Sequence, residues 1–136
     1  MKRRSALFLI VGVAWLLGAA CSIAQDAERL VVGPETMSRL RELRREEKFA
    51  GNRIMTPKEK VSMARTINSM LDRLVAGLEE HPTRDWVVAQ IRPAVADFYL
   101  EDTEVREPCV LYVSAVFKIL GLSGSKGAFR EYMIEF

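Results

Sequence analysis

The sequence contains little of the chemistry on which most enzymes depend. Its 136 residues include one histidine, His81, and two cysteines, Cys21 and Cys109. No glycine-rich phosphate loop follows a strand, no nucleophile elbow occurs, and no pair of histidines has the spacing of metal ligands. We therefore expect no cofactor and no metal ion, and no motif identifies a catalytic residue.

Strand signals are missing as well. No two alternating apolar runs are joined by hairpin residues, and the chain has neither an internal repeat nor a low-complexity segment. Hydrophobic residues make up 49% of the chain and charged residues 28%, which is typical of a globular protein and not of a disordered one. The sequence thus predicts one all-α domain.

The N-terminus combines a basic start with an apolar run. Met1–Arg4 is positively charged, and Ala6–Ala20 carries no charge. This run is shorter than the roughly twenty residues of a membrane-spanning helix, and it has the length of a secretory signal. Because Ser22 and Ala24 are small enough for a cleavage site, we expect a signal-peptide helix over residues 1–24.

Export would place the mature protein outside the cytoplasm, either in the periplasm or secreted through the general secretory route. We expect a flexible mature N-terminus over residues 25–34 and a single helical domain over residues 35–136. The alternative is a lipoprotein, in which Cys21 carries the lipid, or an uncleaved anchor. Gly18 stands where lipoprotein signals usually have a large aliphatic residue, which favours soluble export.

The positive charge of the chain belongs to its N-terminus. Removal of residues 1–24 changes the net charge from +2 to −1, since 17 basic and 18 acidic residues remain. We therefore expect no nucleic-acid partner. Contact with a membrane is expected only through the signal or through a lipid at Cys21.

Apolar residues recur at helical spacing in four segments, followed by a short apolar tail. The predicted helices cover residues 34–51, 56–80, 83–99 and a segment that ends at Gly121, with a short C-terminal helix within residues 123–136. The fold expected is a small bundle of four main helices plus that short helix. An aromatic last residue, Phe136, indicates that the tail is docked on the core.

Local signals fix two helix ends. Thr56, Pro57 and Glu59 form the pattern of a capping box, in which Thr56 caps the helix and Glu59 binds back to the amide of Thr56. Gly121 is a typical helix stop, and Leu122 supplies the hydrophobic contact that often follows such a glycine. Cys109 lies on the inner side of the last main helix, so we expect a buried and unreactive thiol.

Four carboxylates crowd into seven residues before the last main helix: Glu101, Asp102, Glu104 and Glu107. Acids suit a helix N-terminus, and Arg106 can bind back to one of them. Pro108 would cost a hydrogen bond inside the helix, so we expect the regular helix to begin nearer Glu107. A metal site would need ligands from another segment, and the spacing does not match a calcium loop.

The first helix carries a ladder of mixed charges. A solvated helix face explains it simply. The alternative is an arginine-rich docking face for an acidic partner, with Arg41 and Arg45 as its candidates.

Several short patterns occur together from Thr56 to the C-terminus. They are Pro82-Thr83 before Asp85-Trp86-Val87, Arg92-Pro93, Asp102-Thr103-Glu104 with Arg106-Glu107, Ile119-Leu120-Gly121, and Phe136. In these patterns the chain resembles an uncharacterised bacterial family of small domains of unknown function. The resemblance implies an all-helical domain without an established activity, and it transfers no functional residue.

We favour a binding module over an enzyme. The hypothesis is a small exported protein-binding or inhibitor- or immunity-like module of the bacterial envelope, which contacts a protein partner through a loop-rich end. The candidate partner-binding residues are Glu104, Arg106, Glu107, Arg41 and Arg45. The competing hypotheses are a small envelope hydrolase that uses the acidic cluster at residues 101–107, and a structural lipoprotein anchored at Cys21.

Overall fold

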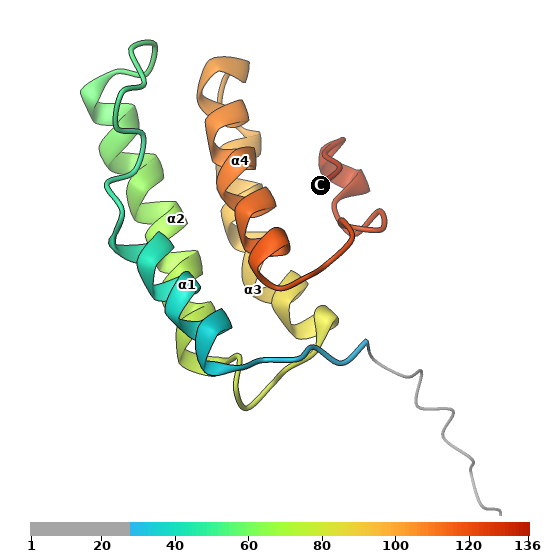
Figure 1. Cartoon of the computed structure of the whole chain (residues 1–136). Helices are drawn as coiled ribbons and strands as arrows, with labels where there is room; N and C mark the ends of the chain where they lie inside the picture. The colour runs from blue at the N-terminus through green and yellow to red at the C-terminus, as the bar shows by residue number, and fades with distance from the viewer. Residues whose placement is uncertain (1–27) are drawn as a thin grey trace, which may run out of the picture.

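The computed structural model describes residues 28–136 (Figure 1). The predicted signal peptide, its cleavage site and Cys21 lie outside the described residues. The described chain forms α1 (Pro34–Arg45), α2 (Pro57–Gly77), α3 (Arg84–Tyr99), α4 (Thr103–Ile119) and a 3-10 turn, η1 (Arg130–Tyr132). The predicted all-α bundle of four main helices is confirmed, and the short C-terminal helix is this single turn.

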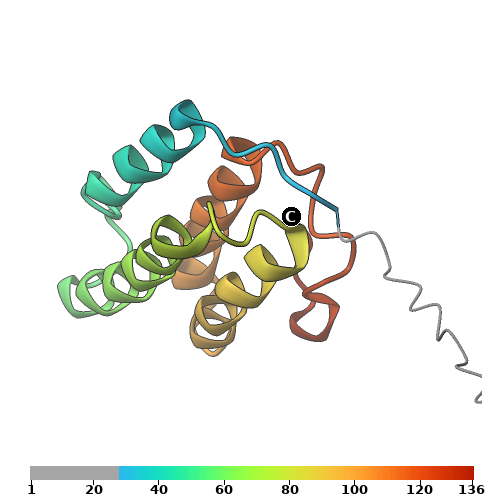
Figure 2. The same ribbon diagram turned by 90° about the horizontal axis from the view of Figure 1, so that it is seen from below.

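The four helices enclose one apolar core. α2 packs against α1, α3 and α4, and α4 also packs against α1 and α3. Figure 2 shows the helices arranged around a shared interior. Its fully buried side chains come from all four helices and include Leu40, Ile67, Leu71, Ile91, Phe98 and Val113.

α2 begins at the predicted capping box. The Thr56 hydroxyl accepts from the Glu59 amide at 3.3 Å, and the Glu59 carboxylate accepts from the Thr56 amide at 2.7 Å. Two amides that a helix start leaves without partners are thus satisfied. Because this signal is contained within four residues, the sequence alone was enough to predict it.

α1 ends at Arg45, and the prediction that it continues to Gly51 is wrong. The side chain of Lys48 folds back and is 6% exposed. Its ammonium donates to the carbonyl oxygens of Leu43, Arg44 and Glu46 at 2.6, 3.3 and 2.5 Å. Carbonyls at the end of a helix have no intrahelical donors, so the Lys48 side chain caps the C-terminus of α1.

α4 begins at Thr103, with Asp102 at the N-cap position, so the prediction that the regular helix starts near Glu107 is wrong. Pro108 lies inside the helix and removes only the hydrogen bond to the carbonyl of Glu104. Glu104 is exposed, so water can reach the first turns of α4. The helix therefore tolerates the proline.

The far end of α4 is as predicted. Gly121 has a φ of 67°, a left-handed conformation that favours glycine. The Leu122 amide donates to the Phe117 carbonyl at 2.9 Å, and the Leu122 side chain is buried. Together these contacts form a glycine helix cap.

Residues 28–33, which we call the N-terminal strap, belong to the segment predicted to be flexible. The strap lies in an extended conformation beside the turn between α2 and α3. The Leu30 amide donates to the Pro82 carbonyl at 2.8 Å, and the Arg84 amide donates to the Glu28 carbonyl at 2.9 Å. The strap is therefore held by backbone hydrogen bonds.

Arg84 also connects the strap to the C-terminal tail. Its buried guanidinium donates to the Gly124 carbonyl at 2.7 Å and lies 3.6 Å from the Glu28 carboxylate. The Lys126 amine binds the same carboxylate at 2.9 Å. The tail is docked as predicted, because the Phe136 ring stacks on Phe117 with 5.6 Å between ring centroids.

Candidate functional site

The predicted residues Glu104, Arg106 and Glu107 lie on the first two turns of α4. Both glutamates are exposed and Arg106 is half-buried. The Arg106 guanidinium donates to the Thr103 hydroxyl at 3.3 Å. In the described part of the chain, none of the three takes part in an ion pair, so both carboxylates are available to a partner.

The face of α4 that carries the two glutamates continues as an apolar stripe. Positions 104, 107, 108, 111, 112 and 115 are three or four residues apart, so they share one side of the helix. Beyond the glutamates this side carries Pro108, Leu111, Tyr112 and Ala115. Leu111 is 68% exposed, although it is a large aliphatic residue on a central helix.

Two adjoining hollows flank this stripe. One, of about 300 Å³, lies between α4 and the end of α1 with the segment that follows it, where Leu43, Glu46 and Phe49 form the opposite wall. The other, of about 380 Å³, is lined by α4 alone, from Arg106 to Leu111. Both hollows include Pro108 and Leu111, so they form one surface, which we call the α4 groove.

The wall of the α4 groove opposite the stripe is held in place by specific contacts. The Phe49 amide donates to the Tyr112 hydroxyl at 3.0 Å, and the two rings meet edge to face with centroids 5.2 Å apart. Phe49 has a φ of 62°, which is a strained conformation for an aromatic residue. These contacts maintain that strain, and the groove is therefore preformed.

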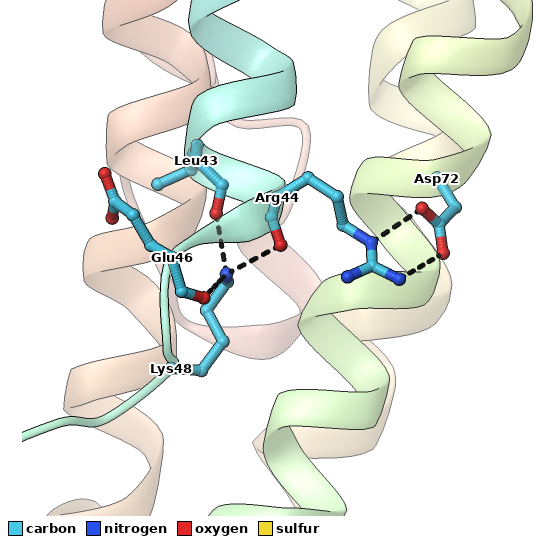
Figure 3. A network of polar contacts seen from close by, with 5 residues as sticks. All are labelled: Leu43, Arg44, Glu46, Lys48 and Asp72. Carbon is cyan, nitrogen blue, oxygen red and sulfur yellow. Dashed lines mark hydrogen bonds and ion pairs between the residues drawn. The ribbon is translucent and has the colours of Figure 1, made fainter.

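Lys48 lies beside the same wall, and Figure 3 shows its ammonium directed at the carbonyl oxygens of Leu43, Arg44 and Glu46. Its Nζ lies 5.7 Å from the centroid of the Tyr112 ring. Burial lowers the pKa of Lys48, and the nearby Glu46 carboxylate opposes that change. The three donors of the ammonium are directed at three carbonyls, so this lysine has a structural role and is not placed as a nucleophile.

Arg44 connects α1 to α2 on the other side. Its Nε and Nη2 bind the two carboxylate oxygens of Asp72 at 2.6 and 3.1 Å (Figure 3). The Arg44 guanidinium holds the pKa of Asp72 below its usual range. This forked ion pair joins the C-terminal end of α1 to α2.

Arg41 and Arg45 do not join the acidic residues in one site. Both are exposed on α1, and Arg45 lines a separate hollow of about 650 Å³ between residues 44–51 and the first turns of α2. Asn68 lies in that hollow, and its buried Oδ1 has no hydrogen-bond partner in the described part of the chain. This hollow shares Glu46 and Phe49 with the α4 groove, but its other wall comes from α2 and not from α4.

The described residues offer little catalytic chemistry. Between Glu28 and Phe136 no three His, Cys, Asp or Glu side chains are grouped to hold a metal ion. Cys109 is fully buried as predicted, and burial raises the pKa of its thiol to about 12. His81 stacks on Trp86 with ring centroids 5.5 Å apart. Across the same part of the chain, no helix has the length and apolar character needed to span a membrane.

The sequence interpretation missed the residue at the centre of the groove. Leu111 lies off the inner face that Cys109, Val113 and Val116 define, and it follows Glu104 and Glu107 at helical spacing. The sequence did contain a signal for an exposed contact, because Leu111 is an apolar residue on the side of the helix that carries charged residues. The structural role of Arg84 had no local signal, because its partners Glu28 and Gly124 are distant in the sequence. Lys48 did have one, since a lysine shortly after a helix can bind the last carbonyls of that helix.

Comparison with known proteins yields one finding. A family model described as "Domain of unknown function (DUF4844)" matches residues 31–136. No curated protein and no solved structure matches the chain. The match starts within the N-terminal strap and covers all four helices and the docked tail. The chain therefore belongs to the DUF4844 family, whose function is unknown.

Proposed function

We propose that this domain is a protein-binding module whose contact surface is the α4 groove. The observation that carries the proposal is Leu111, a 68% exposed aliphatic side chain that lines two apolar hollows. The exposed carboxylates of Glu107 and Glu104 lie about one and two helical turns before it. An apolar anchor point surrounded by charged groups is typical of the central contact in a protein interface.

The rigidity of the groove supports the same proposal. Phe49 and Tyr112 are fixed by a hydrogen bond and ring packing, and Lys48 is fixed by three carbonyls. A preformed surface loses little conformational entropy when a partner binds, so a small contact area can still give useful affinity.

We further propose that the module works outside the cytoplasm, as an inhibitor- or immunity-like protein of the bacterial envelope. The basic residues Met1–Arg4 and the apolar run Ala6–Ala20 support export. Anchoring through Cys21 remains the alternative, and the intact mass of the mature protein tests it. A lipidated species that starts at Cys21 would exclude cleavage before Gln25.

The hydrolase hypothesis has less support. Two carboxylates that act as acid and base need environments that separate their pKa values. Glu104 and Glu107 are both exposed on the same helix face. We therefore assign the acidic residues a recognition role.

The test is affinity capture from envelope extract with three baits: the wild-type protein, Leu111→Asp and Met133→Asp. Met133 is the matched control, because it is 83% exposed and lies on the C-terminal tail, outside the α4 groove. Its left-handed backbone also tolerates aspartate.

We expect one stoichiometric partner with the wild-type and Met133→Asp baits, and its loss with Leu111→Asp. Thermal unfolding of all three proteins checks that each is folded, and binding of the purified partner to the purified protein checks that the contact is direct. Equal capture by all three baits would contradict the proposal.

A further inference from the structure

We propose that the partner segment is a short basic amphipathic helix, which lies in the α4 groove where a longer α1 would otherwise pack. This inference rests on the proposed function and adds the chemistry and shape of the partner. Three features of the described chain support it: the length of α1, the pattern of the α4 stripe, and the charge around the groove.

α1 is much shorter than the helices it packs against. It has 12 residues and a length of about 18 Å, whereas α2 has 21 residues and is about 31 Å long. In Figure 1 the chain after α1 continues as a loop beside α2, and the described chain places no helix on the α1 side of the N-terminal half of α4. The α4 groove lies in that position.

The protein cannot close this space by extending α1. Lys48 binds the terminal carbonyls of α1, and the Phe49 backbone is fixed to Tyr112. Both contacts hold the chain in its turn away from the α1 axis. The space is therefore a lasting feature of the fold.

The stripe on α4 has the pattern of a helix-packing surface. Its residues from Glu104 to Ala115 recur every three or four positions and extend for about 16 Å along α4. Side chains in such rows form ridges, and a second helix packs between them. A partner helix of about three turns matches this length and would bury Leu111.

The charged residues around the groove indicate whether the partner segment is basic or acidic. Glu46 lines the hollow on the loop side, Glu107 lines the other hollow, and Glu104 lies one turn before Pro108 on the same face. Arg106 is the basic residue of this lining. The Lys48 ammonium beside Tyr112 is buried and bound by three carbonyls. Among the solvent-accessible groups at the groove, three carboxylates and one guanidinium therefore favour a helix with lysine or arginine beside its apolar positions.

The probes for a test are two synthetic peptides of about 14 residues, long enough for three to four helical turns. Both carry leucines at helical spacing. One has lysines at its polar positions and the other has glutamates at the same positions. Their binding to the purified full-length protein is measured by fluorescence anisotropy at low salt and at physiological salt.

We expect the lysine peptide to bind about tenfold or more tightly than the glutamate peptide, which corresponds to about 1.4 kcal/mol. Leu111→Asp should abolish binding, Met133→Asp should leave it unchanged, and Glu104→Lys combined with Glu107→Lys should reverse the preference. Equal affinity for the two peptides, or lysine-peptide binding that persists in Leu111→Asp, would overturn the inference.

The outcomes separate this inference from the proposed function. If partner capture depends on Leu111 and the peptides show no preference, the binding role stands and the proposed partner chemistry is wrong. If neither experiment depends on Leu111, both proposals fail. A concentration-dependent dimer that dissociates in Leu111→Asp would identify a second copy as the occupant and would also overturn the inference.

Discussion

At the scale of single residues, Lys48 shows how one side chain shapes a surface. Most lysines keep their ammonium in water, and burial of that charge is costly unless it is fully hydrogen-bonded. Here three carbonyls at the end of α1 satisfy it. The same interaction ends α1 and leaves the α4 groove open.

Lys48→Met should lower the free energy of unfolding by about 1–3 kcal/mol, because carbonyls near the end of α1 lose their donor. Urea denaturation measures the change. Lys58→Met is the control, since Lys58 is exposed and a surface substitution should change stability by less than about 0.5 kcal/mol. Equal stabilities of the two variants would show that Lys48 does not cap α1.

Cys109 should not react with thiol reagents while the protein is folded. Its pKa of about 12 keeps the buried thiol protonated at neutral pH, and the thiolate is the reactive form. We expect modification of Cys109 to require unfolding, as followed by peptide mass spectrometry of native and urea-treated protein. The pKa of Cys109 is higher in the folded protein than in the unfolded chain. The contribution of Cys109 to stability should therefore fall as the pH rises from the ordinary thiol pKa toward about 12. Rapid modification of the native protein would contradict this.

Asp72→Asn tests the ion pair between α1 and α2. Both side chains are partly exposed, at 38% for Arg44 and 58% for Asp72, so the loss at neutral pH should be small, about 0.5 kcal/mol. The pKa of Asp72 is lowered in the folded protein, so its contribution is present above the ordinary aspartate pKa and is lost as the pH falls through the lowered value. Wild type and variant should therefore converge in acid. A constant difference from neutral pH to acid would argue against the ion pair.

At the scale of elements, the contact between α2 and Trp86 determines which residue fits at the last position of α2. Gly77 is the last residue of that helix, and an added Cβ would lie 2.5 Å from the Trp86 ring. By helix propensity alone, alanine would be more stable than glycine at such a position. The Trp86 ring, which belongs to the next helix, leaves no room for the extra methyl group, so glycine is expected to be the more stable residue here.

Gly77→Ala should destabilise the protein by about 1–3 kcal/mol through overpacking, despite the better helix propensity of alanine. Thermal unfolding and tryptophan fluorescence would both report the displaced Trp86. Gly33→Ala is the control, because an added Cβ there meets no atom within 4 Å. Stabilisation by Gly77→Ala would mean that Trp86 moves aside at no cost.

Helix boundaries were predictable where their signals were local. The capping box at Thr56 and the glycine cap at Gly121 each lie within a few consecutive residues, and both were predicted correctly. The C-terminal end of α1 and the start of α4 were not. The end of α1 depends on the fold-back of Lys48, and the start of α4 depends on the tolerance of exposed first turns for Pro108.

At the scale of the whole molecule, the Glu28 carboxylate brings together three distant segments. It binds Lys126 of the tail and lies beside Arg84 at the start of α3, while the backbone of its strap pairs with the turn before α3. The two ends of the described chain are thereby fixed to the same corner of the bundle. That corner is opposite the end at which α4 begins (Figure 1).

This corner should loosen in acid before the core does. The hydrogen bond from Lys126, assisted by Arg84, lowers the pKa of Glu28, so the contact is present at neutral pH and is lost as the pH falls through that lowered value. Hydrogen exchange of the Leu30 amide, corrected for its intrinsic rate, should accelerate in acid. Glu28→Gln should show this faster exchange already at neutral pH.

The Leu71 amide in the core of α2 is the internal control and should keep its protection under the same conditions. If Leu30 and Leu71 lost protection together, the strap would open only with the whole domain. If Leu30 exchanged equally fast at both pH values, the Glu28 contacts would not hold the strap.

The sequence by itself determined the all-α class, the positions of four helices and the buried Cys109, because helical periodicity and caps involve neighbouring residues. Only the tertiary structure decided which apolar residue stays exposed. Leu111 lines a hollow because α1 ends at Arg45. α1 ends there because the Lys48 ammonium binds the last carbonyls of the helix and the Phe49 amide donates to the Tyr112 hydroxyl. The contact between Phe49 and Tyr112 joins residues that are 63 positions apart, which periodicity cannot connect, so only the tertiary structure reveals the groove.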